Sequence, residues 1–140
     1  MKEVLVPVAS PGFIQRNGLN PALIRPDEIA RLDLIDYERF NAHWISFRQW
    51  FARLAIPPKV RIAPRLSFST YSLAVDAALR GEGITLGSTG LIADELASGT
   101  LIELGTHRLD TGYGYHLGTP RYRSLTPGAI RLHQHLLSGI

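Results

Sequence analysis

The sequence predicts an α/β domain in which helices flank a mixed, mostly parallel sheet. One observation is that short apolar runs typical of buried strands alternate along the chain with segments of helical spacing. A second is that glycine, proline, serine and threonine separate nearly every pair of these segments. A third is size: 140 residues, 45% hydrophobic and 19% charged, fit one globular domain and hardly two.

The expected strands are short and mostly apolar. They are predicted at residues 4–8, 34–37, 66–69, 84–86, 101–104 and 113–117, with a polar connection before the last. In the third strand Leu66 and Phe68 alternate with two serines, so its two faces differ in polarity.

The first helices are expected between these strands. Residues 13–16 can form one helical turn, and 26–31 a short helix that begins with proline and two acids. Trp44, Phe47, Phe51 and Leu54 then recur at helical spacing, with Asn41 as the expected cap. Such a stripe is usually core. Trp44, at the start of this helix, is the member expected to line a site.

The later helices are predicted from their caps. The alanine-rich helix at 71–80 would pack closely on the sheet, with Asp76 and Arg80 forming an i,i+4 ion pair. Glycines at 81 and 83 end it. Ser88 or Thr89 is expected to cap the next helix, which stops at Gly99. The last helix starts at residues 126–127, Thr-Pro.

Several kinds of chemistry lack their sequence patterns. There is no cysteine, and the five histidines have no metal-ligand spacing. There is no Gly-x-Ser-x-Gly motif, and the glycines at 81–83 follow a helix instead of preceding one, so they do not fit a dinucleotide loop. No apolar run could cross a membrane. The net charge of +3 is scattered rather than clustered, unlike a nucleic-acid footprint.

From these patterns we expect no cofactor, no metal, no membrane span and no direct contact with nucleic acid. The lack of cysteine fits a reducing compartment, the cytoplasm.

One polar cluster remains as a candidate site. Ser69-Thr70-Tyr71-Ser72 lies where a strand ends and a helix begins, a place that offers unpaired N–H groups and partial positive charge. Such a position suits a small ligand, and an anion in particular. Simple helix capping by Ser69 or Thr70 explains the residues equally well.

Several ordered segments resemble the effector-binding domain of LysR-type transcriptional regulators, in the branch of the glycine-cleavage activator and the β-lactamase regulator. They are 68–87 (FSTYSLAVDAALRGEGITLG), 91–102 (LIADELASGTLI), 3–11 (EVLVPVASP) and 113–120 (YGYHLGTP). The last two resemble the family's first and second crossover strands. The resemblance covers nearly the whole chain.

The resemblance implies an incomplete form of a two-lobed domain like a periplasmic binding protein. Residues 1–109 would hold a crossover strand and the second lobe, and 110–140 the returning crossover strand and part of the first lobe. The chain looks truncated, without the family's helix-turn-helix. It would bind a small-molecule effector between lobes to modulate transcription.

Site residues are implied by the same resemblance. Ser69, Thr70 and Tyr71 match the effector contacts of the second lobe, and Tyr115 matches a cleft-facing position in the second crossover. Pro7 and Val8 border the first crossover. Tyr37 and Trp44 are further candidates for the wall.

Two other functions stay open at this point. The chain could be a remnant that acts only as an interaction module, forming a homodimer by pairing an exposed sheet edge. It could also be a small hydrolase using Ser10 or Ser69 with a histidine. Because no base–nucleophile arrangement is visible, we expect no enzyme.

Overall fold

The computed structural model describes residues 1–37 and 44–139. Its six strands form one sheet in the order β3-β2-β4-β1-β5, and β6 pairs with β1 as well. The strands are β1 (Lys2–Ala9), β2 (Leu34–Tyr37), β3 (Leu66–Phe68), β4 (Ile84–Ser88), β5 (Ile102–Glu103) and β6 (Leu109–Gly114). β1 is antiparallel to β4, β5 and β6, whereas β2 is parallel to β3 and β4. One strand therefore opposes five, which confirms the mixed sheet; two of its strand pairs are parallel and three are antiparallel.

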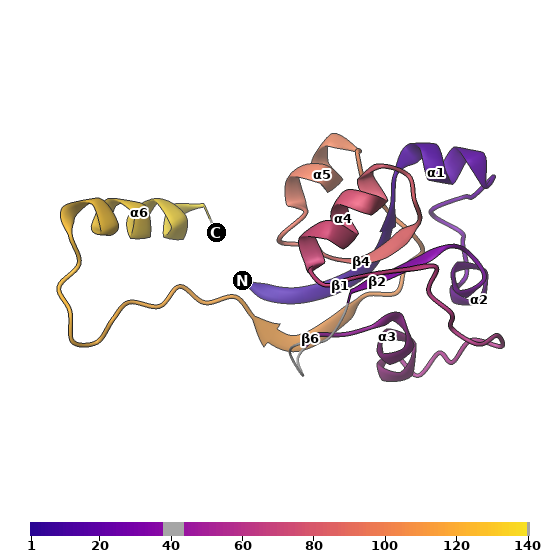
Figure 1. The fold of residues 1–140 in the computed structure, drawn as a ribbon, viewed down its shortest axis with the longest axis horizontal. Helices are drawn as coiled ribbons and strands as arrows, with labels where there is room; N and C mark the ends of the chain where they lie inside the picture. The colour runs from indigo at the N-terminus through magenta and orange to yellow at the C-terminus, as the bar shows by residue number, and fades with distance from the viewer. Residues whose placement is uncertain (38–43, 140) are drawn as a thin grey trace.

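Helices cover both faces of this sheet (Figure 1). α1 (Pro11–Arg16), α2 (Pro26–Ala30) and α3 (Phe47–Arg53) pack on one face, and α4 (Tyr71–Leu79) and α5 (Ala93–Ser98) on the other. Alternation in β1 divides its side chains between the two layers: Leu5 and Ala9 join the first core, Val6 and Val8 the second. The result is three layers, helix on sheet on helix.

Trp50 is the largest fully buried side chain of the first layer. Its indole Nε1 donates a hydrogen bond of 3.2 Å to the Leu5 carbonyl oxygen, which ties α3 to the central strand. Phe47 and Phe51 flank it at 0% and 1% exposure. Phe47 and Phe51 are therefore core, as the spacing of the stripe predicts, whereas Leu54 and Trp44 are only half-buried.

The turn between α4 and β4 depends on two glycines. Gly81 adopts φ +80°, a left-handed conformation that ends the helix. At Gly83 a Cβ atom would lie 2.4 Å from the Asp33 carbonyl oxygen, so only glycine lets the backbone pass β2 this closely. The predicted pair of Asp76 and Arg80 is confirmed at 3.2 Å.

The start of α3 differs from the prediction. Ser46 caps the helix and forms a capping box with Gln49, so α3 begins at Phe47. Asn41, the predicted cap, lies outside the described residues. Placing Trp44 at the helix start was wrong, because this residue precedes the helix.

Two other boundaries also differ. Ser88 is the last residue of β4 and caps no helix, since α5 begins only at Ala93 after a turn closed by the bond from Leu91 N to Ser88 O. The predicted strand at 113–117 begins earlier, at Leu109, because β1 offers a free edge there and pairs Leu5 with Leu109. Pairing with a distant strand overrode the local polarity of this segment.

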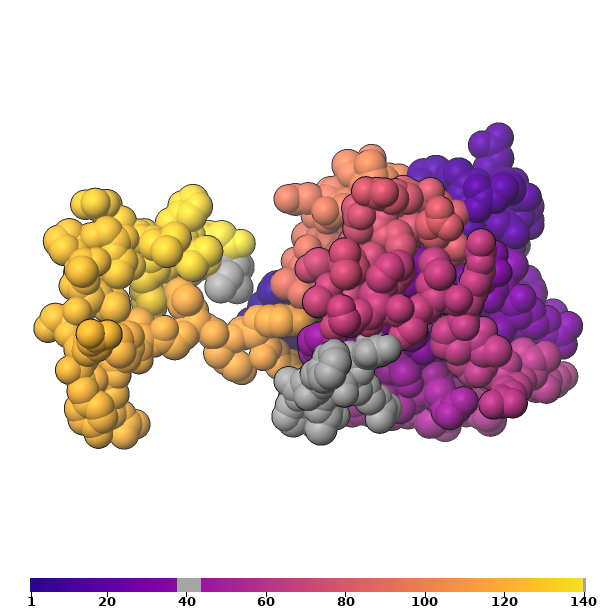
Figure 2. Space-filling model, in the orientation of Figure 1, coloured from indigo at the N-terminus to yellow at the C-terminus, as the bar shows by residue number. Residues whose placement is uncertain are grey.

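Beyond β6 the chain leaves the body as a C-terminal arm, residues 115–139. It ends in α6 (Pro127–Ser138), which stands apart from the three layers (Figure 2). Thr126 caps α6 as predicted, accepting a hydrogen bond from Ala129 N. No residue of α6 is buried. Its exposed apolar residues are Ile130, Leu132, Leu136 and Leu137.

Candidate effector site at the strand ends

The candidate site lies at one end of the sheet. β2 and β4 end there with Tyr37 and Ser88, and α4 begins there with Tyr71, directly after β3. Since β1 runs the opposite way, its first residues reach the same end and bring Glu3 with them. In open α/β sheets, ligands bind beyond the carboxyl ends of the strands.

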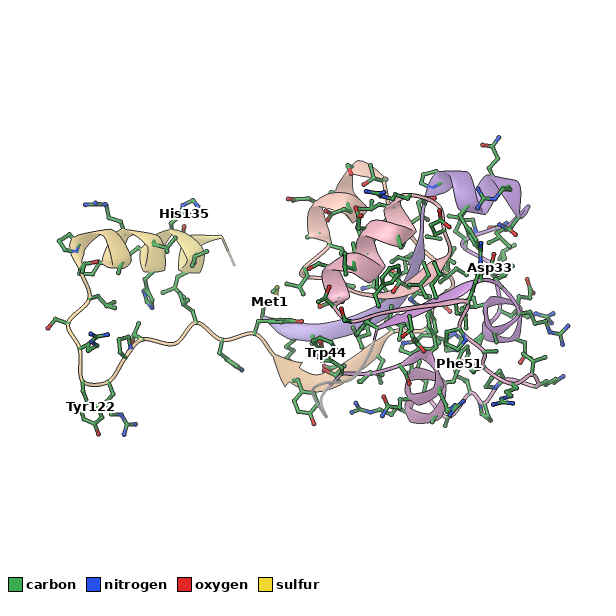
Figure 3. The ribbon with its side chains drawn as sticks, viewed as in Figure 1. Met1, Asp33, Trp44, Phe51, Tyr122 and His135 are labelled. Carbon is green, nitrogen blue, oxygen red and sulfur yellow. The ribbon has the colours of Figure 1, made fainter. Side chains whose placement is uncertain are left out.

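Three aromatic rings form the centre of the site. The Tyr37 ring lies 5.5 Å from the Tyr71 ring and 5.7 Å from the Trp44 ring, centroid to centroid, with interplanar angles of 85° and 79°. Tyr37 is buried, and the other two rings are half-buried. Figure 3 shows Trp44 close to the β1–β6 end of the body, far from Tyr122 and His135 in the arm.

The Tyr71 hydroxyl has a fixed role in the fold. It accepts a hydrogen bond of 2.9 Å from the backbone N–H of Ser88, which links the start of α4 to the end of β4. Its own proton remains available to donate. Burial raises the pKa of Tyr71 to about 12, and the negative charges of Glu3 and Glu95 contribute.

The other two tyrosines are also held neutral. Burial raises the pKa of Tyr37 far above its ordinary value, with Glu3 and Asp36 adding to the effect. The pKa of Tyr115 is raised by burial and by the charge of Glu3, which outweigh a smaller lowering effect of the Ser88 side chain. All three hydroxyls are therefore protonated at neutral pH and can donate hydrogen bonds.

Glu3 and Tyr115 meet across 112 positions of sequence. The Tyr115 hydroxyl donates to Glu3 Oε1 at 3.3 Å, and the Thr111 hydroxyl donates to Glu3 Oε2 at 2.8 Å. The backbone N–H of Tyr115 also donates to the Met1 carbonyl oxygen. These contacts fasten the start of the arm to the start of β1.

Ser88 adds a buried hydroxyl. Its side-chain oxygen is fully buried and makes no hydrogen bond of good geometry within residues 1–37 and 44–139, although it lies close enough to the Tyr115 hydroxyl to lower the pKa of that group. Burying such a group without a partner costs about 1–3 kcal/mol, which makes it a natural position for a ligand or a water molecule.

The remaining predicted residues fall into two groups. Ser69 and Thr70 lie exposed beside Tyr71, and the Thr70 hydroxyl caps α4 by accepting from Leu73 N at 3.4 Å. Pro7 and Val8 are buried in the middle of β1, opposite Leu86 and Thr85, and lie away from the tyrosines. The structure thus brings together Tyr37, Trp44, Tyr71 and Tyr115, with Ser69 and Thr70 alongside.

Sequence reasoning missed Glu3 and Ser88. Ser88 had a usable signal, since it is a polar residue directly after a buried strand. Glu3 had none, because only the antiparallel direction of β1 brings it to this end of the sheet. Within the described part of the chain, no three His, Cys, Asp or Glu residues are placed to hold a metal ion, and no helix is long and apolar enough to cross a membrane.

The architecture is that of a periplasmic-binding-protein-like lobe. The chain belongs to the LysR family, because the family model of the LysR substrate binding domain matches residues 1–139. Among curated relatives, the HTH-type transcriptional regulator PtxR of Pseudomonas aeruginosa is 30% identical over 71% of this chain and 30% of its own length. An uncharacterized HTH-type transcriptional regulator, y4mQ of Sinorhizobium fredii, is 32% identical over 86% of this chain and 37% of its own length.

Solved structures agree on the fold. The effector domain of the transcriptional regulator AmpR of Pseudomonas aeruginosa matches 99% of this chain and 62% of its own, with a TM-score of 0.64 and 19% identity. This chain therefore spans about a third of the length of the curated regulators it matches and under two thirds of this effector domain. Its relatives are transcriptional regulators.

Proposed function

We propose that this chain is the sensor part of a LysR-type transcriptional regulator and binds a small-molecule effector at the site around Tyr37 and Tyr71. The observation on which this rests is the Ser88 hydroxyl, buried without a well-formed hydrogen bond at the carboxyl ends of the strands, beside the protonated hydroxyls of Tyr37 and Tyr71. A packed core seldom leaves such donors unsatisfied, whereas a ligand site uses them.

The effector would act by changing the angle between two lobes. The boundary we propose is near residue 109, with 1–109 as crossover and second lobe and 110–140 as the return to the first. β1 and β6, the two crossover strands, pair with each other through residues 2–5 and 109–114. A ligand that prefers one arrangement would shift the equilibrium toward it, and this pair of strands is the natural hinge.

In this proposal the 140 residues contact no nucleic acid themselves, need no cofactor, catalyse no reaction and work in the cytoplasm. Regulation of transcription would pass through DNA-binding segments beyond these residues.

A substitution at Ser88 tests the proposal. Because its hydroxyl makes no well-formed hydrogen bond, Ser88→Ala should leave the free energy of unfolding unchanged or raise it slightly, by up to about 1 kcal/mol. The matched control is Thr85→Val, since the Thr85 hydroxyl donates to the Ile35 carbonyl oxygen, and its loss should destabilise the fold by about 1–2 kcal/mol.

Both variants would be screened against a metabolite library by thermal shift and by NMR. We expect a compound that moves the Tyr71 and Trp44 resonances of the wild-type chain and binds Ser88→Ala at least fivefold more weakly. If no compound in the library perturbs these residues, the sensor proposal is wrong.

A homodimeric interaction module is the second candidate, and the arm favours it. Residues 111–140 contain three arginines and no acidic residue, so this segment carries a charge of +3. Because the whole chain also carries +3, the net charge of residues 1–110 is zero. The apolar side chains of α6 lie open beside these charges. An exposed amphipathic helix of this kind needs a partner surface.

The partner we propose for α6 is the α4–α5 surface of a second copy. A groove of about 380 Å³ there is lined by Val75, Leu79 and Leu91, with Asp76 and Glu95 at its sides. Residues 66–102 hold four carboxylates and one arginine, complementary to the cationic arm. Sedimentation of the 140-residue chain should show a dimer. The Leu136→Asp variant should be monomeric, and the dimer affinity of the unmodified chain should fall as the salt concentration rises. A monomer at all protein concentrations contradicts this candidate.

A further inference from the structure

A second concave site lies at the opposite end of the sheet from the three tyrosines. β1 runs antiparallel to each strand that it pairs with, so its carboxyl end points away from the effector site and continues through Ser10 into α1. Ligands of open α/β sheets bind beyond the carboxyl ends of strands. The end of β1 therefore meets the same geometric rule as the strand ends at Tyr37 and Ser88.

A cavity of about 420 Å³ lies at this end, where α1 meets the C-terminal ends of α4 and α5. We call it the β1-end cavity. Its wall includes two arginines, Arg16 and Arg80, and three hydroxyl side chains, those of Ser10, Ser98 and Thr100. A cavity of this volume suits a small metabolite.

The charge on the wall distinguishes the β1-end cavity from three other cavities. No described Asp or Glu lines it, whereas the others include Glu103, Asp36, or the pair Asp76 and Glu95. A carboxylate repels an anion and can occupy a neighbouring arginine, as Glu103 does by accepting two hydrogen bonds from Arg108. The wall of the β1-end cavity is cationic, so it favours an anion.

Arg16 is held in place by contacts that leave most of its donors free. Its Nη2 donates to the Gly81 carbonyl oxygen at 2.7 Å, which fixes the guanidinium at the end of α4. Its Cζ lies 5.5 Å from the centre of the Phe13 ring. Arg16 has no other partner within residues 1–37 and 44–139, and a guanidinium carries several N–H donors in a planar fork.

Arg80 lies next in sequence to the residue that Arg16 contacts. Its Nε is 3.2 Å from Asp76 Oδ2, in an exposed pair with side-chain exposures of 74% and 55%. Such pairs are weak, so Asp76 does not prevent Arg80 from binding a ligand. The terminal nitrogens of Arg80 have no partner in the described part of the chain. Two guanidinium forks at one cavity are suited to a phosphate group, which they bind through paired hydrogen bonds.

Ser10 adds a buried hydroxyl to the wall. The residue is 6% exposed, and its Oγ accepts a hydrogen bond of 3.2 Å from Phe13 N. The hydroxyl proton has no acceptor among the described residues, so it can donate to an anion in the cavity. As a nucleophile Ser10 would need a base, and no described histidine lines this cavity. Its position therefore suits binding and not catalysis.

We propose that the β1-end cavity is a second ligand site, which binds the phosphate group of a small phosphorylated metabolite. Arg16 and Arg80 bind the phosphate oxygens, and Ser10 donates a hydrogen bond to them. A phosphate group alone would leave most of the cavity empty, so the rest of the metabolite lies along Leu79 and Thr100. This site goes beyond the proposed sensor function and does not depend on it.

Three probes test the proposal on the intact 140-residue chain: glycerol 3-phosphate, inorganic phosphate and glycerol. Binding is followed by NMR at the amides of Gly81 and Gly99, in about 0.15 M sodium chloride to screen diffuse attraction to the surface. We expect saturable binding of glycerol 3-phosphate, at least about fivefold weaker binding of inorganic phosphate, and no binding of glycerol.

The Arg80→Gln variant removes one guanidinium from the wall and should fold, because its ion pair is exposed. It should weaken binding of glycerol 3-phosphate at least about fivefold. Arg65→Gln is the matched control, since Arg65 also forms an exposed ion pair at 3.2 Å but does not line the cavity, and it should leave the affinity unchanged. Arg16→Lys keeps the charge and loses the planar fork, so it should also weaken binding.

Each outcome decides the inference. It is overturned if the folded chain shows no saturable binding of glycerol 3-phosphate, or if Arg65→Gln weakens binding as much as Arg80→Gln. Inorganic phosphate that binds as tightly as the ester would assign the cavity to free phosphate and reject the metabolite. Shifts at Gly81 and Gly99 report on this cavity, and shifts at Tyr71 and Trp44 on the effector site, so either proposal can fail without the other.

Discussion

Replacing Tyr71 with phenylalanine removes one hydroxyl and keeps the ring. The contact with Tyr37, at 5.5 Å, should survive, because it involves only the aromatic faces and edges. The hydrogen bond of 2.9 Å from Ser88 N is lost, and that part-buried N–H is left without its acceptor. An unsatisfied buried donor costs about 1–3 kcal/mol, and partial burial places the expected loss at about 1–2 kcal/mol.

The assay is urea unfolding at pH 7, followed by tryptophan fluorescence. The midpoint should fall while the dependence on denaturant stays constant, since the surface exposed on unfolding barely changes. Tyr122→Phe is the control, because that side chain is 92% exposed and its hydroxyl should matter by less than about 0.5 kcal/mol.

Alkaline pH gives a second, independent readout of Tyr71. Its pKa rises from 10.0 to about 12 on folding, so the unfolded chain loses this proton first. The contribution of the Tyr71 hydroxyl to the free energy of unfolding is therefore fully present below pH 10 and declines as the pH rises toward 12. Tyr71→Phe lacks this titration, so the difference in stability between the two proteins should narrow over that range. A difference that is absent at pH 7, or that stays constant from pH 10 to 12, refutes the reasoning.

Three further substitutions test the fold. Gly83→Ala should lower the free energy of unfolding in urea by about 2–3 kcal/mol, because its Cβ would approach the Asp33 carbonyl oxygen to 2.4 Å and force the backbone apart. An unchanged free energy of unfolding would disprove this close approach. Trp50→Phe removes the hydrogen-bond donor to the Leu5 carbonyl oxygen and leaves a small cavity, so the free energy of unfolding should fall by about 2–3 kcal/mol in the same assay. An unchanged unfolding midpoint would contradict this contact. Arg80→Ala breaks an exposed i,i+4 ion pair and should cost only about 0.3–0.5 kcal/mol, less in 1 M salt, so a loss above 1 kcal/mol would require another role for Arg80.

The candidate site was only partly predictable, and the two missed residues show why. Tyr71 and Thr70 are neighbours in sequence, so a strand followed by a helix start was enough to find them. Ser88 follows the same rule at the end of the next strand in the sequence, but its local context also predicts a helix cap, which the structure does not show. Glu3 and Tyr115 lie 112 positions apart and meet only because β1 pairs with β6.

The sequence by itself determined the elements whose signals are local. The strand at 34–37, the helix that begins at Tyr71 and the cap of α6 at Thr126 are predicted by alternation, helical spacing and capping side chains within a few residues. The aromatic stripe at Phe47 and Phe51 likewise predicts a buried helix face. These features depend on neighbours in the chain, which a single sequence displays.

Only the tertiary structure decided the direction of β1 and, with it, the charge of the site. A strand's direction in a sheet is fixed by long-range pairing, and no local pattern encodes it. Because β1 runs against the other five strands, its first residues reach the carboxyl ends of β2 and β4. That placement puts the Glu3 carboxylate in hydrogen-bond contact with the Tyr115 hydroxyl, where its negative charge opposes the anion preference that the sequence around Tyr71 predicts.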